Sequence, residues 1–208
     1  MDSRQAALHI AEIQSRLSSA QTFRGYRSLT VACTGLLALA VAACQPLWVP
    51  APAEAPLVWL AGWLGAAAVS LAGVAVELVL RCRRSGSTWF VRVTLSAVGR
   101  FLPCVAAGAA LTAVLAIGHP DTLWMLPGLW AILFSLGVLA SCAVLPREIA
   151  WAGLFYLAAG IGCLVWASGS SAFSPAAMGC TFGGGQLLTA AILYWRLEHS
   201  HDGSLQEV

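Results

Sequence analysis

The segment with the most unusual chemistry is rich in glycine and reads Gly179-Cys-Thr-Phe-Gly183-Gly184-Gly185-Gln186. Three consecutive glycines destabilise a helix unless the missing side chains serve a purpose. Two interpretations remain open. One is a locally unwound helix that lines a substrate site; the other is close helix packing through Gly179 and Gly183, with Gln186 hydrogen-bonded to a neighbouring helix. The candidate substrate or helix-packing site comprises Gly179, Gly183, Gly184, Gly185 and Gln186.

A second candidate site is a group of arginines suited to binding anionic lipid headgroups or to docking a cytoplasmic partner. Its members are Arg81, Arg83, Arg84, Arg92 and Arg100. Glu77 stands four residues before Arg81, a spacing that predicts a salt bridge along one helix face. A carboxylate that carries protons is the alternative, but the position of Glu77 near the end of an apolar run favours the salt bridge.

Other reactive groups form no complete site. The tail contains Glu198, His199, His201 and Asp202, but no second cluster completes a metal shell, so we predict no metal. Val41-Ala-Ala-Cys44 resembles a lipoprotein processing box, yet the segment before it is too long for a signal peptide. No apolar run contains histidine, and the chain has no C-x-x-C motif or phosphate-binding loop. We therefore predict no catalytic residue, no cofactor and no enzymatic activity.

The composition indicates which elements position these residues. Of 208 residues, 59% are hydrophobic and 10% are charged, whereas soluble domains carry about 25% charged residues. Six continuous apolar runs lie near the length of about 20 residues that a helix needs to cross a bilayer. The runs span about 29–49, 57–80, 101–118, 122–145, 149–168 and 174–195. The predicted fold is all-α: a polytopic membrane protein with a bundle of six transmembrane helices and an N-terminal amphipathic helix.

The distribution of arginine predicts the orientation. All 11 basic residues are arginine, and with six crossings they all fall on one side of the membrane. The opposite loops, about 50–56, 119–121 and 169–173, contain none. The positive-inside rule therefore places both termini in the cytoplasm. Because the chain lacks lysine and asparagine, which have A-rich codons, we expect a GC-rich bacterial genome and the bacterial inner membrane.

Tryptophan supports the same arrangement. Interfacial belts are predicted from Trp48, Trp59, Trp124 and Trp166 on the outer side and from Trp89, Trp151 and Trp195 on the inner side. Two further residues, Trp63 and Trp130, should pack between helices.

The predicted organisation has three parts. Residues 1–28 form a cytoplasmic segment with an amphipathic helix over 3–21, residues 29–195 form the transmembrane domain, and residues 196–208 form a cytoplasmic tail. A second amphipathic helix, lying in the membrane interface, is predicted over 86–100. Pro127 lies inside the fourth run and should kink that helix.

Two segments carry a family resemblance. They are Ala11-Glu12-Ile13 with Ala20–Ser28, and Met178-Gly179 with Phe182–Leu187 and Ala191–Trp195. With the six-span plan, they resemble a group of small, uncharacterised bacterial six-span integral membrane proteins. That resemblance implies no activity, but it implies genes beside winged-helix transcription regulators. The size and span number also resemble the substrate-binding components of energy-coupling-factor vitamin transporters, without a diagnostic motif.

The sequence favours a non-enzymatic sensor or accessory membrane subunit. The alternative is a small-solute transporter, or a substrate-binding transporter subunit, with its site near the glycine-rich sixth helix. The predicted partners are the lipid bilayer and a cytoplasmic or membrane protein. A net charge of +2 predicts no nucleic-acid partner. The sequence does not determine the oligomeric state.

Overall fold

The computed structural model describes residues 28–85, 88–143, 147–167 and 169–195. Its elements in chain order are α2 (Ser28–Trp48), α3 (Pro56–Ser85), α4 (Thr88–Gly118), the 3-10 helix η1 (Pro120–Met125), α5 (Leu126–Ser141), α6 (Ile149–Trp166), the 3-10 helix η2 (Gly169–Phe173), α7 (Pro175–Met178), the π-helix η3 (Gly179–Gly184) and α8 (Gly185–Leu193). The described residues contain six helical spans long and apolar enough to cross a membrane. The predicted all-α, six-span fold is confirmed.

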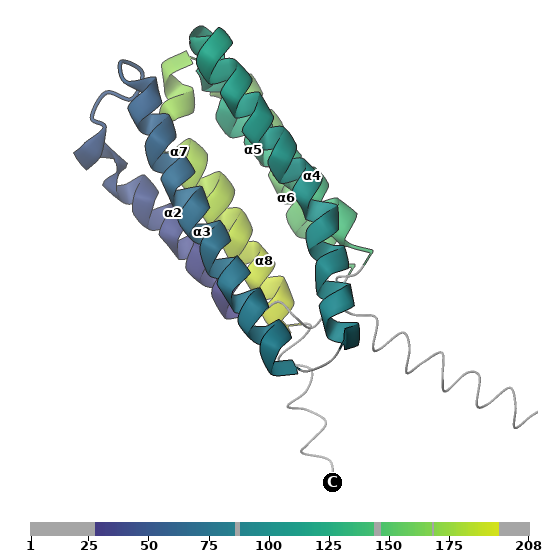
Figure 1. Ribbon diagram of the computed structural model, residues 1–208. Helices are drawn as coiled ribbons and strands as arrows, with labels where there is room; N and C mark the ends of the chain where they lie inside the picture. The colour runs from purple at the N-terminus through teal and green to yellow at the C-terminus, as the bar shows by residue number, and fades with distance from the viewer. Residues whose placement is uncertain (1–27, 86–87, 144–146, 168, 196–208) are drawn as a thin grey trace, which may run out of the picture.

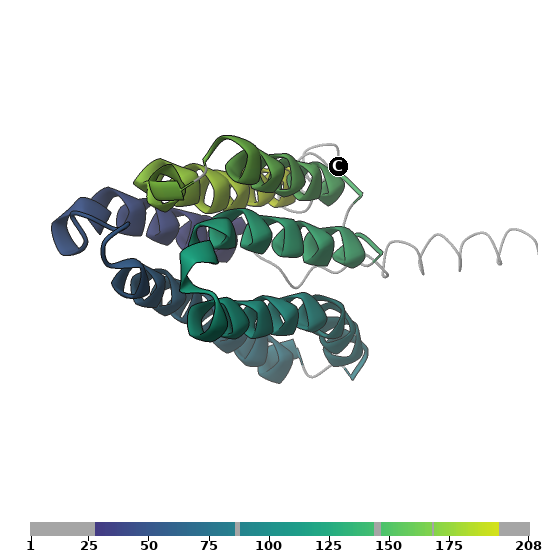
Figure 2. The ribbon, with the colours of Figure 1, turned by 90° about the horizontal axis from the view of Figure 1, so that it is seen from above.

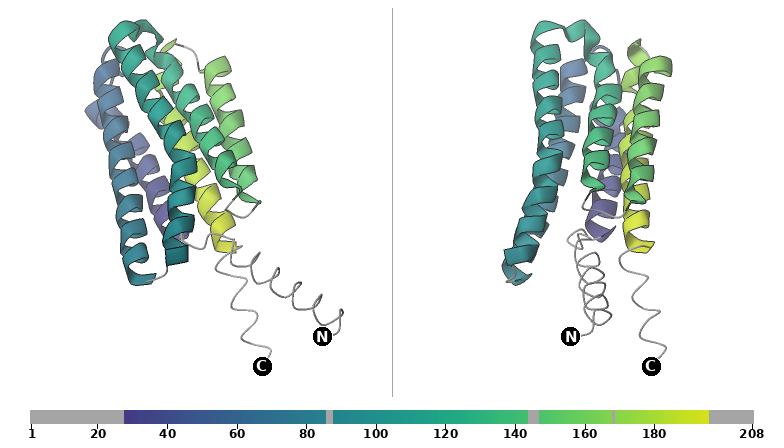
Figure 3. Two further views of the ribbon diagram at one scale, coloured as in Figure 1. Left: turned by 45° about the vertical axis from the view of Figure 1, so that its right-hand side comes forward. Right: turned by 90° about the vertical axis from the view of Figure 1, so that its right-hand side faces the viewer.

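The spans form a ring that follows the chain order. Helix α2 contacts α3, and each later span contacts the next until α8 returns to α2. Figures 1 and 2 show the spans side by side along one common direction. Helix α3 ends and α4 begins at one end of the bundle, and η1 and η2 lie at the other (Figure 3). We call these the arginine end, with Arg81, Arg83 and Arg84, and the tryptophan end, with Trp59 and Trp63.

The third span differs from the sequence prediction. Helix α4 runs without a break over Thr88–Gly118 and contains Pro103, so the separate in-plane helix over 86–100 is wrong. The physical reason is that a break would leave several backbone donors and acceptors unpaired near lipid, whereas a continuous helix pairs them internally except at Pro103, which has no N–H. The predicted amphipathic helix over 3–21 and the tail lie outside the described residues.

The fourth span also begins differently. Pro127 stands in the first turn of α5, directly after η1. The predicted position of Pro127, inside an α-helix, is therefore wrong. A proline in the first turn loses no intrahelical hydrogen bond, because the first N–H groups of a helix have no partner there.

Glycines allow α5 and α6 to approach closely. A Cβ at Gly160 would lie 2.8 Å from the Gly128 carbonyl oxygen, and a Cβ at Gly128 would lie 2.8 Å from the Gly160 carbonyl oxygen. About two turns further on, Ser135 Oγ donates a hydrogen bond of 2.8 Å to the Gly153 carbonyl oxygen. The crossing therefore brings backbone against backbone, as small residues permit in membrane helices.

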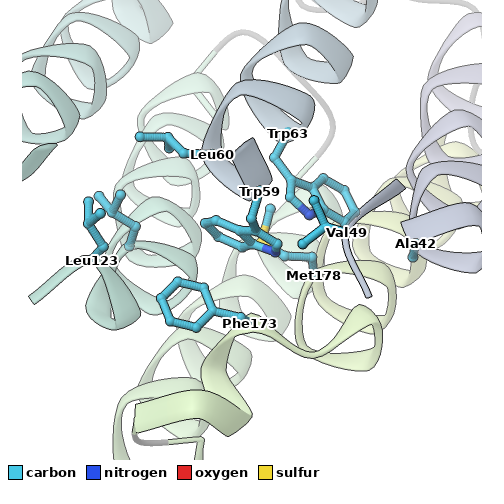
Figure 4. Close-up of a cluster of buried hydrophobic side chains, with 9 residues drawn as sticks. Ala42, Val49, Trp59, Leu60, Trp63, Leu123, Phe173 and Met178 are labelled. Carbon is cyan, nitrogen blue, oxygen red and sulfur yellow. The ribbon is translucent and has the colours of Figure 1, made fainter. Parts of the chain in front are cut away.

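Two hydrophobic clusters fill the ends of the ring. The cluster at the tryptophan end is drawn in Figure 4 and comprises Ala42, Val49, Trp59, Leu60, Trp63, Leu123, Leu126, Phe173 and Met178. The cluster at the arginine end comprises Val31, Val138, Ile149, Ala190 and Leu193. Between them lie the rings of Phe134, Tyr156 and Phe182, with centroids 4.7–6.1 Å apart.

Candidate functional site

The glycine-rich segment is helical throughout. Ser174 caps the sixth span, since its Oγ accepts a hydrogen bond of 3.3 Å from the Ala177 N–H. The backbone continues as α7, passes through the π turn η3 over Gly179–Gly184, and resumes as α8 at Gly185. The locally unwound helix considered from the sequence is not the geometry of this segment. A π turn instead places one extra residue in the helix, and such turns are frequent at functional sites.

The first two glycines of the segment face α2. A Cβ at Gly179 would lie 2.8 Å from the Ala42 Cβ, and one at Gly183 would lie 2.6 Å from Leu39 Cγ. Gly35 of α2 completes the contact, because a Cβ there would lie 3.1 Å from the Gly183 carbonyl oxygen. These distances are the geometry of close helix packing.

The next two glycines differ from each other. Gly185 faces α6, where a Cβ would lie 2.6 Å from Tyr156 Oη. A Cβ at Gly184 would meet only Phe155 Cζ, at 3.7 Å, which is an ordinary van der Waals distance. The observed packing therefore requires glycine at position 185 but not at position 184.

Gln186 does not make the predicted interhelical hydrogen bond. Its side chain is half-buried, and no hydrogen bond to it is found among the described residues. The polar groups near the π turn bond elsewhere. Tyr156 Oη donates a long hydrogen bond of 3.5 Å to the Phe182 carbonyl oxygen, and Cys163 Sγ lies 3.7 Å from Thr181 Oγ1.

The amide that does bridge the bundle is Gln45, which the sequence reasoning missed. It is 1% exposed. Its Nε2 donates a hydrogen bond of 2.7 Å to the Phe173 carbonyl oxygen, and its Oε1 accepts one of 3.2 Å from Trp63 Nε1. Gln45 thus joins α2, α3 and η2. Its position in the last turn of an apolar run was the only available sequence signal.

Trp59 departs from the predicted interfacial belt. It is fully buried, stacks on Trp130 with ring centroids 6.2 Å apart, and meets Phe173 edge-on at 5.0 Å. Its Nε1 has no hydrogen-bond partner among the described residues. Trp63 is buried and Trp130 is half-buried against the same cluster, so both pack between helices as expected, and Trp130 Nε1 donates a hydrogen bond of 2.9 Å to Thr112 Oγ1.

The candidate arginines are divided between α3 and α4. Arg81 Nη2 lies 2.9 Å from Glu77 Oε1, in the geometry expected for the salt bridge. Arg83 and Arg84 are exposed at the end of α3, and Arg92 and Arg100 are exposed along the first turns of α4. This surface can offer guanidinium groups to headgroups or to acidic side chains.

The interior offers little acid–base chemistry. The buried polar side chains of the described residues are Ser28, Gln45, Thr94, Thr112, Ser135, Ser141 and Thr181, together with the phenol of Tyr156. The same residues contain no group of three His, Cys, Asp or Glu placed to bind a metal. His199 and His201 lie outside the described residues. No protein-family model, no curated protein and no solved structure matches the chain.

Proposed function

We propose that the protein is a non-enzymatic accessory subunit of the bacterial inner membrane that holds a partner membrane protein against α3 and α4. One observation carries the proposal. Every side chain described from Leu64 to Arg84 of α3 is exposed or half-buried. A helix that packs in a bundle buries one face along its length. Helix α3 does so only near its first turns, where Trp59, Leu60 and Trp63 are buried.

The exposed part of α3 is shaped for another helix. Gly65 and Gly73 are spaced two turns apart, and a Cβ at either position would find no atom within 4 Å among the described residues. Small residues let helix backbones approach closely, so that van der Waals contacts replace contacts with lipid. Large apolar side chains, Val69 and Val76, are exposed between and beyond the two glycines.

The charges favour an acidic partner over a second copy of the chain. Arg83 and Arg84 are exposed at the end of this surface, whereas Arg81 is already paired with Glu77. A second copy docked through α3 would bring like charges together, which costs free energy at short range. Carboxylates on a partner at the same membrane depth would instead form charge-assisted hydrogen bonds with the guanidinium groups.

The orientation and the absence of catalysis are part of the proposal. The distribution of arginine supports cytoplasmic termini and places the arginine end on the cytoplasmic side. The buried polar side chains of the described residues include no acid and no base apart from the Tyr156 phenol, which supports a non-enzymatic role.

Site-specific photo-cross-linking in cells tests the proposed docking surface. A photoreactive residue is placed at Val69 or Val76 of α3, which are 63% and 58% exposed, and at the matched control Val165 of α6, which is 62% exposed. We expect one discrete protein adduct from the two α3 positions and none from Val165. Adducts of equal yield from all three positions, or only lipid adducts from α3, would contradict the proposal.

A second set of variants tests whether docking of the partner depends on Arg83 and Arg84. The double variant Arg83→Gln/Arg84→Gln should reduce the α3 adduct, because two exposed ion pairs contribute up to about 1 kcal/mol each, or up to about thirtyfold in binding. Arg147→Gln, which replaces an exposed arginine two residues before α6, should leave the adduct unchanged. An equal loss of adduct in both variants would show that the net charge of the protein, rather than docking at α3, determines the cross-linking yield.

A small-solute transporter, or its substrate-binding subunit, is the second candidate. The π turn favours it, because Gly184 leaves space for a Cβ beside Phe155. A solute that binds there should raise the melting temperature in a ligand screen. Gly184→Leu should abolish the shift while the protein stays folded, and Gly65→Leu should preserve it. A shift that survives Gly184→Leu would exclude this site.

A further inference from the structure

The π turn of the sixth span separates two anchored halves. The half before it is held by Gln45, which bonds to the Phe173 carbonyl oxygen, and by Met178 in the cluster at the tryptophan end. The half after it is held by Ala190 and Leu193 in the cluster at the arginine end. A displacement of the extra residue along the helix between these anchors would leave both ends in place.

When a π turn moves along a helix, each residue that it passes rotates about the helix axis and takes the place of its neighbour in the sequence. One position corresponds to about 100° about the helix axis. A step toward the arginine end would bring residue 184 to the place that Gly185 now occupies against Tyr156. A step toward the tryptophan end would bring it to the place that Gly183 now occupies against Leu39. A Cβ fits in neither place, because it would lie 2.6 Å from Tyr156 Oη or 2.6 Å from Leu39 Cγ.

This geometry gives Gly184 a role that the observed packing does not. Gly183 and Gly185 are each required by a neighbouring side chain, whereas a Cβ at Gly184 has room at 3.7 Å from Phe155. A glycine at position 184 is required only if the helix also adopts the shifted register. We propose that η3 is a conformational joint, in which the π turn exchanges between two registers one residue apart and the glycine triplet lets both registers pack.

The step toward the arginine end places glycine at the tight position. Gly184 would then face Tyr156 in place of Gly185, and Gly185 would take the place of Gln186 beside Gly35, where a side chain is already accommodated. A step toward the tryptophan end that passed through the whole π turn would move Cys180 to the place of Gly179. Its Cβ would then lie 2.8 Å from the Ala42 Cβ, which is too close. The joint therefore moves toward the arginine end. The Gln186 amide rotates with it, since it has no hydrogen bond among the described residues.

Fluorine NMR tests the two registers. A 4-fluorophenylalanine is incorporated at Phe182, whose ring centroid lies 6.0 Å from Tyr156 and 6.1 Å from Phe134. The para position does not change when the ring flips, so a second signal reports a second environment. We expect the purified full chain in micelles to give two signals, or one signal broadened by exchange. Gly184→Ala should leave one sharp signal, because alanine fits only the observed register.

The matched control is Gly65→Ala, which also adds a methyl group to an open helical position. It should leave both signals of the parent protein unchanged. One sharp signal in the parent protein at all temperatures would overturn the proposal, and so would two signals that persist in Gly184→Ala. Loss of folding in Gly184→Ala would also overturn it, because the observed register has room for this methyl group.

Discussion

Replacing Gly160 by alanine should lower the free energy of unfolding by about 3 kcal/mol, the upper range for an added methyl group in a packed core. The new Cβ would lie 2.8 Å from the Gly128 carbonyl oxygen and 3.0 Å from the Ile132 backbone nitrogen. Neither atom can move without displacing α5 from α6. The change is measured by reversible unfolding in mixed micelles that contain increasing fractions of a denaturing detergent.

Gly162→Ala is the matched control on the same helix. There the added Cβ would meet only the Trp166 ring, at 3.2 Å. Trp166 is 83% exposed, so its ring can turn away at little cost. We expect the free energy of unfolding to change by no more than about 0.5 kcal/mol, the range typical of surface substitutions. Equal destabilisation by the two variants would show that the contact between Gly160 and Gly128 does not hold α5 against α6.

Replacing Gln45 by leucine should cost about 2 kcal/mol of unfolding free energy. The variant removes the partner of the Phe173 carbonyl oxygen at 2.7 Å and of Trp63 Nε1 at 3.2 Å. Leucine has a similar volume, so the loss reports unpaired polar groups rather than a cavity. Buried groups left without partners cost about 1–3 kcal/mol each in soluble proteins, and somewhat less in membranes.

Gln186→Leu provides the comparison for this prediction. The Gln186 side chain is half-buried and makes no hydrogen bond among the described residues. Its replacement should change the free energy of unfolding by less than about 0.5 kcal/mol, or increase it, because an unpaired amide is removed. If Gln186→Leu proved more damaging than Gln45→Leu, the assignment of the bridging amide to Gln45 would be wrong. Both variants are measured in the same unfolding assay.

The two glutamines illustrate what a sequence pattern cannot distinguish. Both lie in apolar runs, and Gln186 drew attention because glycines precede it and because it falls near the middle of a run. The folded chain bonds Gln45 instead, because α3 and η2 bring Trp63 and the Phe173 carbonyl group to it from positions 18 and 128 residues away. Hydrogen-bond satisfaction depends on such distant partners, which composition and spacing do not identify.

The glycines show the same limit at the level of packing. The pair Gly179 and Gly183 stood out because a four-residue spacing places both on one helix face. The close contact between Gly128 and Gly160 has no such signal, since neither glycine has another glycine four residues away and the two meet only where α5 crosses α6. The π turn was missed as well, because its extra residue is placed by contacts with α2 and α6 rather than by local propensity.

The number of spans and their all-α character follow from the amino-acid sequence, because the length and continuity of apolar runs reflect the thickness of the bilayer and the need to pair every backbone group. The Glu77–Arg81 pair also follows from it, since that pair depends only on local helical spacing. In contrast, the burial of Gln45 and Trp59, the short packed length of α3 and the π turn of the sixth span are apparent only in the folded chain. These features depend on which helix faces meet, and that is set by the shapes of side chains distant in the sequence.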